Sequence, residues 1–151
     1  MENLTEESVS EHPQLQIFSR GGVKFAIPIE EIAAVADWRR PTALPQAPPA
    51  VLGVIAIQGR MLTVLDPLIF LGASGAETDL NRLIVALRGD EQLALLVGEK
   101  GETFVGASEN DEVGGAWRGM INRNDEPIRI LDVKKLFALS MRGRERRQRR
   151  F

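Results

Sequence analysis

The sequence repeats itself at an offset of 66 residues, and this internal repeat restricts the fold more than any other feature. When residues 52–71 are laid over residues 118–137, Gly53 falls on Gly119 and Asp66 falls on Asp132. Two copies are too few for a solenoid of stacked repeats. The repeat therefore predicts two similar small units packed against each other.

Each unit is predicted to consist mainly of β-strands. Short apolar runs alternate with turn-forming residues, as on either side of Gln58–Gly59–Arg60. The expected strands are 15–19, 23–27, 51–57, 61–66, 82–87, 92–97, 103–107, 115–122 and 127–131, with short helices at 67–72 and 133–142. The segment 28–36 fits either a short helix or a strand. The predicted fold class is mostly β, with one barrel from 15–80 and a second from 81–140.

Polar segments without apolar periodicity flank this domain. The lead, residues 1–14, is expected to be disordered, and so are residues 144–151 of the Arg-rich tail 141–151. Six of the 19 Lys and Arg residues lie in 142–151, which leaves an acidic body. Such a tail is a solvated end, an end that folds back on the acidic surface, or a site for nucleic acid or anionic lipid.

The composition excludes several kinds of site. The chain has no cysteine and one histidine, His12 in the lead, which excludes disulfides, thiolate ligands and a structural His-based zinc site. Phosphate-binding, serine-hydrolase and zinc-protease motifs are absent, so we expect no cofactor, no metal and no enzymatic activity. The N-terminus lacks an apolar signal region, and no run of eighteen uncharged apolar residues occurs. These patterns predict a cytoplasmic protein without membrane insertion.

Nucleic-acid binding through the Arg-rich tail is the alternative function that we weigh. Small β-barrels that bind single strands present aromatic side chains in a basic groove. Tyr is absent here, and the Trp and Phe positions in apolar patterns are expected to be core residues: Phe18, Phe25, Trp38, Phe70, Trp117 and Phe137. Nucleic-acid binding is therefore not favoured.

One run of residues resembles a known family. LPQAPPAVLGVIAIQGRMLTVLD (44–66) is similar to the signature of the CheW-like domain of bacterial chemosensory proteins. FSRGGVKFAIPIEEI before it, and LALLVGEKGETFVG and IRILDVKKLFAL after it, follow in the order that the family has. The resemblance covers about residues 15–140.

The resemblance implies both a fold and a function. The fold would be two SH3-like, five-stranded β-barrels with a shared core between them. The function would be that of an adaptor, which joins a chemoreceptor to a CheA-type histidine kinase and can also meet other CheW-like domains. The pathway would be chemotaxis or pilus-type motility.

The resemblance also implies which residues contact the partners. These are Ile32, Ala34, Val35, Gly53, Val54, Ile55, Ala56, Ile57, Gln58, Gly59 and Arg60. Three departures from the family pattern stand out: Gln58 replaces a common Arg, Ala34 replaces a Glu, and Gly98 replaces an Asp. We therefore expect weak binding to a standard receptor tip, and a true partner with neutral contacts or with acidic contacts facing Arg60.

Three residues of the hairpin region are expected to be structural. Gly53 and Gly59 stand where a strand begins or turns, so they should adopt backbone angles that favour glycine. Asp66 precedes the short helix and is expected to cap it, as Asp132 does in the other unit.

Overall fold

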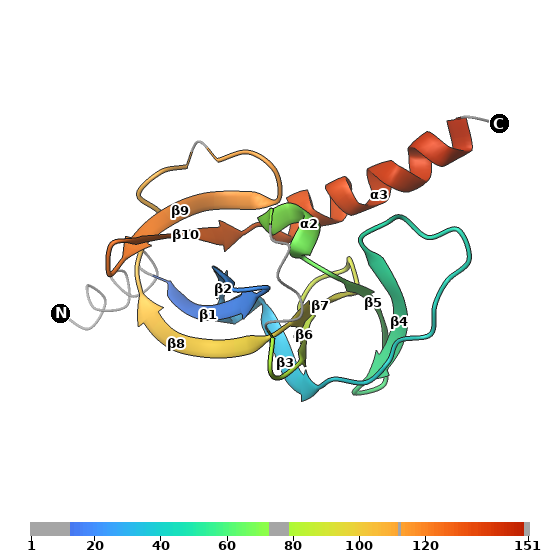
Figure 1. Cartoon of the computed structure of the whole chain (residues 1–151), viewed down its shortest axis with the longest axis horizontal. Coiled ribbons are helices and arrows are strands. Elements are labelled where there is room, and N and C mark those ends of the chain that lie inside the picture. Colours follow the sequence, from blue (N-terminus) through green and yellow to red (C-terminus); the bar gives the residue numbers. More distant parts are fainter. Residues whose placement is uncertain (1–12, 73–78, 112, 150–151) are drawn as a thin grey trace.

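The computed structural model describes residues 13–72, 79–111 and 113–149 and contains two five-stranded sheets (Figure 1). The first sheet, here called barrel A, has the strand order β8-β1-β2-β10-β9. Its strands are β1 (Gln14–Arg20), β2 (Val23–Pro28), β8 (Glu99–Val105), β9 (Trp117–Arg123) and β10 (Glu126–Leu131). Of the lead 1–14 that was predicted to be disordered, residues 1–12 lie outside the described residues, whereas Gln14 already belongs to β1.

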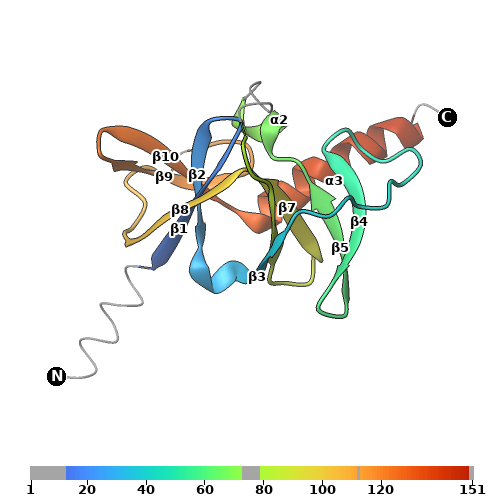
Figure 2. The ribbon, with the colours of Figure 1, turned by 60° about the horizontal axis from the view of Figure 1, so that its bottom comes forward.

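The second sheet, here called barrel B, has the order β3-β6-β7-β5-β4 and lies beside the first (Figure 2). Its strands are β3 (Ile32–Asp37), β4 (Val51–Ile57), β5 (Arg60–Leu65), β6 (Leu83–Leu87) and β7 (Leu93–Val97). The helical elements are η1 (Ile29–Glu31), α2 (Leu68–Leu71) and α3 (Val133–Arg149). The mostly β fold class is confirmed, and segment 28–36 contains both a 3-10 turn and a strand.

The predicted division into barrels 15–80 and 81–140 is wrong, because the two units exchange strands. Barrel A combines β1 and β2 of the first unit with β8, β9 and β10 of the second, and barrel B takes the complementary set. The chain leaves barrel A through η1, so that β3 pairs with β6, and it returns after Gly98, so that β8 pairs with β1. The repeat alone could not reveal this exchange, since a hairpin of one unit can pair with either copy of its partner strands.

The repeat itself is visible in the backbone. The amide of Asp66 donates to the carbonyl of Ala50, and 66 residues later the amide of Asp132 donates to that of Ala116, both at 2.9 Å. In each barrel one parallel pairing joins a hairpin of one unit to a hairpin of the other, β5 with β7 in barrel B and β10 with β2 in barrel A. The two units therefore have the same architecture despite their divergent sequences.

Buried apolar side chains form three clusters. One lies inside barrel A, one lies inside barrel B, and the largest lies between the barrels. Phe18, Phe25 and Trp117 belong to the central cluster, as predicted, and Trp38 packs against the core of barrel B. Phe137 was also predicted to be core, but its side chain is 37% exposed on α3.

Helix α3 extends beyond its predicted end. We expected it to stop at residue 142 and residues 144–151 to be disordered, but the helix continues to Arg149 and projects from the body (Figures 1 and 2). The added residues are mainly Arg, Glu and Gln, which have high helix propensity, and only Gly143 opposes the helix.

Buried ion pairs of Arg20 connect the two barrels. Arg20 at the end of β1 donates from Nε and Nη2 to both carboxylate oxygens of Asp66, at 3.0 and 2.8 Å, and from Nη1 to Asp79 at 2.6 Å. Asp66 also accepts the amide of Leu68 at 3.1 Å, but the N-cap residue of α2 is Pro67, so Asp66 lies one position before the cap that was predicted for it. The ion pair by which Asp66 joins barrel A to barrel B was not predicted, because Arg20 lies 46 residues away in the chain.

Candidate partner-binding surface

The β4–β5 tip, residues 56–61, is the exposed end of a hairpin in barrel B. Gln58 and Gly59 form its turn with φ of 51° and 77°, so both have the positive φ that a tight two-residue turn requires. The equivalent turn of barrel A has the same geometry, with φ of 53° at Asn124 and 62° at Asp125. The structural role predicted for Gly59 is therefore supported by its backbone angle.

The side chains of β4 divide between the two faces of the strand. Ile55 and Ile57 are each 7% exposed and belong to the core of barrel B, so the expectation that they form the centre of a contact surface is wrong for these two. Val54 and Ala56 point the other way, because side chains alternate along a strand. The outward row is the part of β4 that a partner can reach.

Met61 adds to this outward row and was missed from the sequence. It lies opposite Ala56 in the β4–β5 pairing and is 58% exposed. On β5, Leu62 and Val64 are buried, so the alternation that buries them also directs Met61 outward. The alternation of buried and exposed side chains along β5 was the signal in the sequence that could have identified Met61.

Gly53 is buried beneath the loop of residues 41–50, which contains four prolines. Its φ is 146°, and an added Cβ would collide with the carbonyl oxygen of Thr42. Thr42 and Val54 exchange backbone hydrogen bonds of 2.9 Å, which press the loop onto β4. Gly53 therefore shapes the surface without lying on it.

The three candidate residues on β3 have different environments. Ile32 packs against the central cluster, and Ala34 packs against the core of barrel B opposite Ala86. Val35 is 38% exposed and lies opposite the buried Val85. Only Val35 among them offers an exposed side chain, so Ala34 is a core-facing position at which a glutamate would disturb packing.

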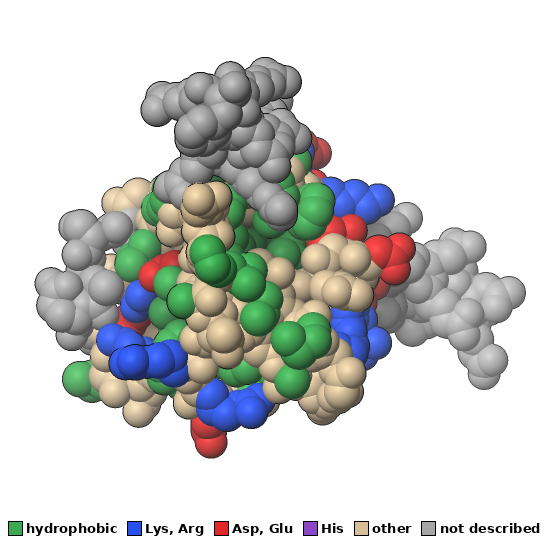
Figure 3. Space-filling model, turned by 90° about the vertical axis from the view of Figure 1, so that its right-hand side faces the viewer, with side chains coloured by type: hydrophobic (Ala, Val, Ile, Leu, Met, Phe, Trp, Pro, Cys, Tyr) green, Lys and Arg blue, Asp and Glu red, His purple; other side chains and the backbone are tan. Residues whose placement is uncertain are grey.

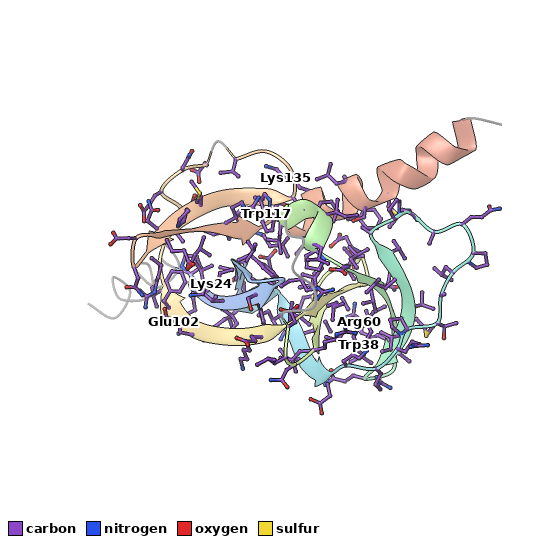
Figure 4. All side chains as sticks on the ribbon, viewed as in Figure 1. Lys24, Trp38, Arg60, Glu102, Trp117 and Lys135 are labelled. Atoms are coloured by element: carbon purple, nitrogen blue, oxygen red, sulfur yellow. The ribbon has the colours of Figure 1, made fainter. Side chains whose placement is uncertain are left out.

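Two arginines make hydrogen bonds to backbone carbonyls at or near the β4–β5 tip. Arg39, which follows β3, donates from Nη2 to the carbonyl of Ala56 at 2.8 Å. Arg60 donates from Nη2 to the carbonyl of Gly89 at 3.3 Å. Figure 4 shows the side chains of Arg60 and Trp38 in the same region of barrel B. On the side of the molecule that Figure 3 faces, hydrophobic side chains occupy the middle and Lys and Arg side chains lie toward its edges.

The departure from the family at Gly98 has a local explanation. The Asp79 carboxyl group fills the place where a side chain at position 98 would lie. Asp79 also accepts the Gly21 amide at 3.2 Å in addition to its bond from Arg20. A carboxylate is thus present at this place, but it comes from residue 79.

Glu31 has the most informative titration behaviour of the described residues near β3. Burial raises the pKa of its carboxyl above the ordinary value, and Arg118 opposes that rise through bonds of 2.7 and 2.8 Å. The negative charges of Asp132 and Glu30 add to the rise. Glu31 lies in the connection between the barrels, where its pairing with Arg118 of β9 joins them.

Within the described ranges, we find no cluster of three His, Cys, Asp or Glu side chains able to hold a metal ion, and none of the helices there is long and apolar enough to cross a membrane. His12 lies outside these ranges. The surface with the best-defined features is therefore the β4–β5 tip with its outward apolar row and flanking arginines.

Comparison with known proteins identifies the family. A family model described as the CheW-like domain matches residues 14–141. The chain belongs to the CheW-like domain family. The "Chemotaxis protein CheW" of Rhizobium meliloti strain 1021 is 25% identical over 111 residues, which cover 74% of this chain and 72% of that protein.

A second CheW protein and a solved structure agree with this assignment. The "Chemotaxis protein CheW" of Bacillus subtilis strain 168 is 28% identical over 89 residues, which cover 58% of this chain and 57% of that protein. The crystal structure of the scaffolding protein TtCheW from Thermoanaerobacter tengcongensis superposes with a TM-score of 0.70 and 17% identity, covering 81% of this chain and 85% of that one. The structural match supports the CheW-like fold with its two SH3-like barrels.

Proposed function

We propose that this CheW-like protein is a non-enzymatic adaptor that couples a chemoreceptor to a CheA-type histidine kinase in the cytoplasm. The pathway is chemotaxis or pilus-type motility. The observation that carries the proposal is the β4–β5 tip, which has Gln58 at the position where the family commonly has arginine and presents an exposed turn beside an outward apolar row.

The receptor-binding part of this surface is Val54, Ala56, the Gln58–Gly59 turn and Met61, with Val35 on β3. An apolar centre with a few polar groups at its edge is the usual composition of a protein interface. Gln58 carries no charge where the family commonly has arginine. Binding to a standard receptor tip is therefore weak, because a carboxylate that meets Gln58 loses its ion pair.

The test is a titration of the purified chain against a generic chemoreceptor signalling tip. Gln58→Arg should tighten binding by about tenfold or more if the lost charge limits affinity. Asn124→Arg is the matched control, because Asn124 occupies the equivalent turn of barrel A with nearly the same φ. Tight binding by the unchanged protein, with no gain from Gln58→Arg, would show that residue 58 does not set partner choice.

Ala34→Glu, the other change that the family pattern suggests, is a poor test of binding. Ala34 packs against the barrel B core, so a glutamate there costs stability before it can offer a charge to a partner. A loss of receptor binding in Ala34→Glu would thus report on folding. Gln58→Arg avoids this difficulty because residue 58 is exposed.

A further inference from the structure

Three arginines from separate elements lie around the β4–β5 tip and the adjoining β6–β7 turn. Arg39 donates to the carbonyl of Ala56 within the tip, and Arg60 of the tip donates to the carbonyl of Gly89 in the β6–β7 turn. Arg88, the neighbour of Gly89, donates from Nε to the carbonyl of Ile32 at 3.1 Å. The three partner carbonyls belong to the tip itself (Ala56), to the β6–β7 turn (Gly89) and to the first residue of β3 (Ile32).

These three arginines have no carboxylate partner among the described side chains. Arg20, Arg118 and Arg123 each pair with an Asp or Glu within 3.0 Å, whereas Arg39, Arg60 and Arg88 take part in none of the ion pairs found. A guanidinium has five N–H donors, and the bonds described above use one on each arginine. Most of their donors are therefore available to another molecule.

Acidic residues close in sequence do not neutralise these arginines through direct pairs. Asp90 and Glu91 lie in the β6–β7 turn and Asp37 ends β3, but the ion pairs of the described part of the chain include none of the three. Glu91 instead folds back over the backbone of Gly89. The free donors at the tip therefore favour an anionic ligand.

The apolar row between the arginines narrows the kind of ligand. Ala56 and Met61 lie opposite each other, with Arg39 bound to the backbone of Ala56 and Arg60 next to Met61 in sequence. Carboxylates suit the fork of a guanidinium, which binds them through two parallel hydrogen bonds. An apolar side chain suits the exposed surface of Met61.

We propose that the β4–β5 tip binds an acidic protein segment of its signalling partner, in which carboxylates flank an apolar side chain. Arg39, Arg60 and Arg88 receive the carboxylates, and Ala56 with Met61 receives the apolar side chain. The inference rests on the proposed adaptor function, since it describes the partner of that surface. On this proposal, three arginines from around the turn take the place of the single arginine that the family commonly has in the turn.

The first experiment is an NMR titration of the full chain with a synthetic amphipathic peptide in which Glu residues flank a Leu. The same peptide with Gln in place of Glu is the control. The Nε–H signals of Arg39, Arg60 and Arg88 should shift when the Glu peptide is added. These shifts should become smaller at high salt, and the Gln peptide should leave the signals unchanged. Equal shifts with both peptides, or shifts confined to other arginines, would overturn the proposal.

The second experiment measures how substitutions change the affinity for the Glu peptide. Arg39→Gln, Arg60→Gln and Arg88→Gln should each weaken binding about two- to fivefold, as exposed ion pairs usually do. Arg123→Gln is the matched control, because Arg123 is an exposed arginine of barrel A that pairs with Glu102. Loss of affinity in Arg123→Gln equal to that in the other three would show only a general charge effect and would contradict the proposal.

Met61→Glu keeps the test informative if an arginine variant is unstable. Residue 61 is exposed, so a glutamate there leaves the core intact and places a carboxylate next to Arg60 in sequence and opposite Ala56, whose carbonyl holds Arg39. Peptide binding should fall at least as far as in Arg60→Gln, with an unchanged unfolding midpoint. If Met61→Glu binds the Glu peptide as the unchanged chain does, the proposal fails, whereas failure of the adaptor function alone would leave the peptide results as predicted.

Discussion

Removing the charge of Arg20 should destabilise the whole protein. Its side chain is 4% exposed, and its countercharges Asp66 and Asp79 are 18% and 4% exposed. In Arg20→Met the side chain keeps much of its apolar stem, so packing is largely retained while two carboxylates lose their partner. Breaking a buried ion pair by removing one partner costs about 3–5 kcal/mol, and we expect the free energy of unfolding to fall by about that amount.

The measurement is urea unfolding followed by tryptophan fluorescence, which reports on the buried Trp117. The triple variant Arg20→Met, Asp66→Asn, Asp79→Asn should recover much of the loss, because no unpaired charge remains at the barrel junction. Lys24→Met is the control, since the Lys24–Glu126 pair is about half exposed on both sides and should contribute under about 1 kcal/mol. A loss in Arg20→Met no larger than that in Lys24→Met would refute the reasoning.

Further predictions concern the hairpin glycines, Glu31 and the C-terminal helix. Gly59→Val should lower the free energy of unfolding by about 1–3 kcal/mol because of its positive φ, and Gly53→Ala should cost more than Gly59→Ala because Thr42 blocks its Cβ. By carboxyl NMR titration, Glu31 should have a pKa above the usual 4.5, and Arg118→Gln should raise it further. Because the pKa of Glu31 is raised in the folded state, protonated Glu31 makes its full contribution to the free energy of unfolding below about pH 4.5, and this contribution is lost as the pH rises through the folded-state pKa. Glu31→Gln should remove this pH dependence. Deleting residues 142–151 should leave the unfolding midpoint unchanged and abolish any weak RNA or DNA binding of the full chain; tight nucleic-acid binding that survives the deletion would contradict the adaptor assignment.

Much of the fold could be predicted because it depends on local patterns. The turn at Gln58–Gly59 and the short helix ended by Gly72 follow from residues close together in sequence, and both are present. The repeat correctly indicated two similar units. It could not indicate that β3–β5 form a barrel with β6–β7 and that β8–β10 form one with β1–β2, because the choice between equivalent strands depends on three-dimensional contacts such as those between β3 and β6.

The candidate surface was predicted only in part for a related reason. Family resemblance marked a continuous stretch of β4, but alternation along the strand buries Ile55 and Ile57 and exposes Val54 and Ala56. The arginines around the tip come from three separate elements, and Arg39 reaches Ala56 only because the barrel brings the two together. Such a cluster has no signature in sequence spacing.

The most direct test of the adaptor assignment is affinity purification of the tagged chain from a lysate of its native cells, with its bound proteins identified by mass spectrometry. The account predicts that a chemoreceptor and a CheA-type histidine kinase are both recovered, and that Met61→Glu loses the receptor while it remains folded. Recovery of neither protein by the unchanged chain would contradict the adaptor function. Recovery of both at equal levels with Met61→Glu would contradict the assignment of the β4–β5 tip as the receptor-binding surface.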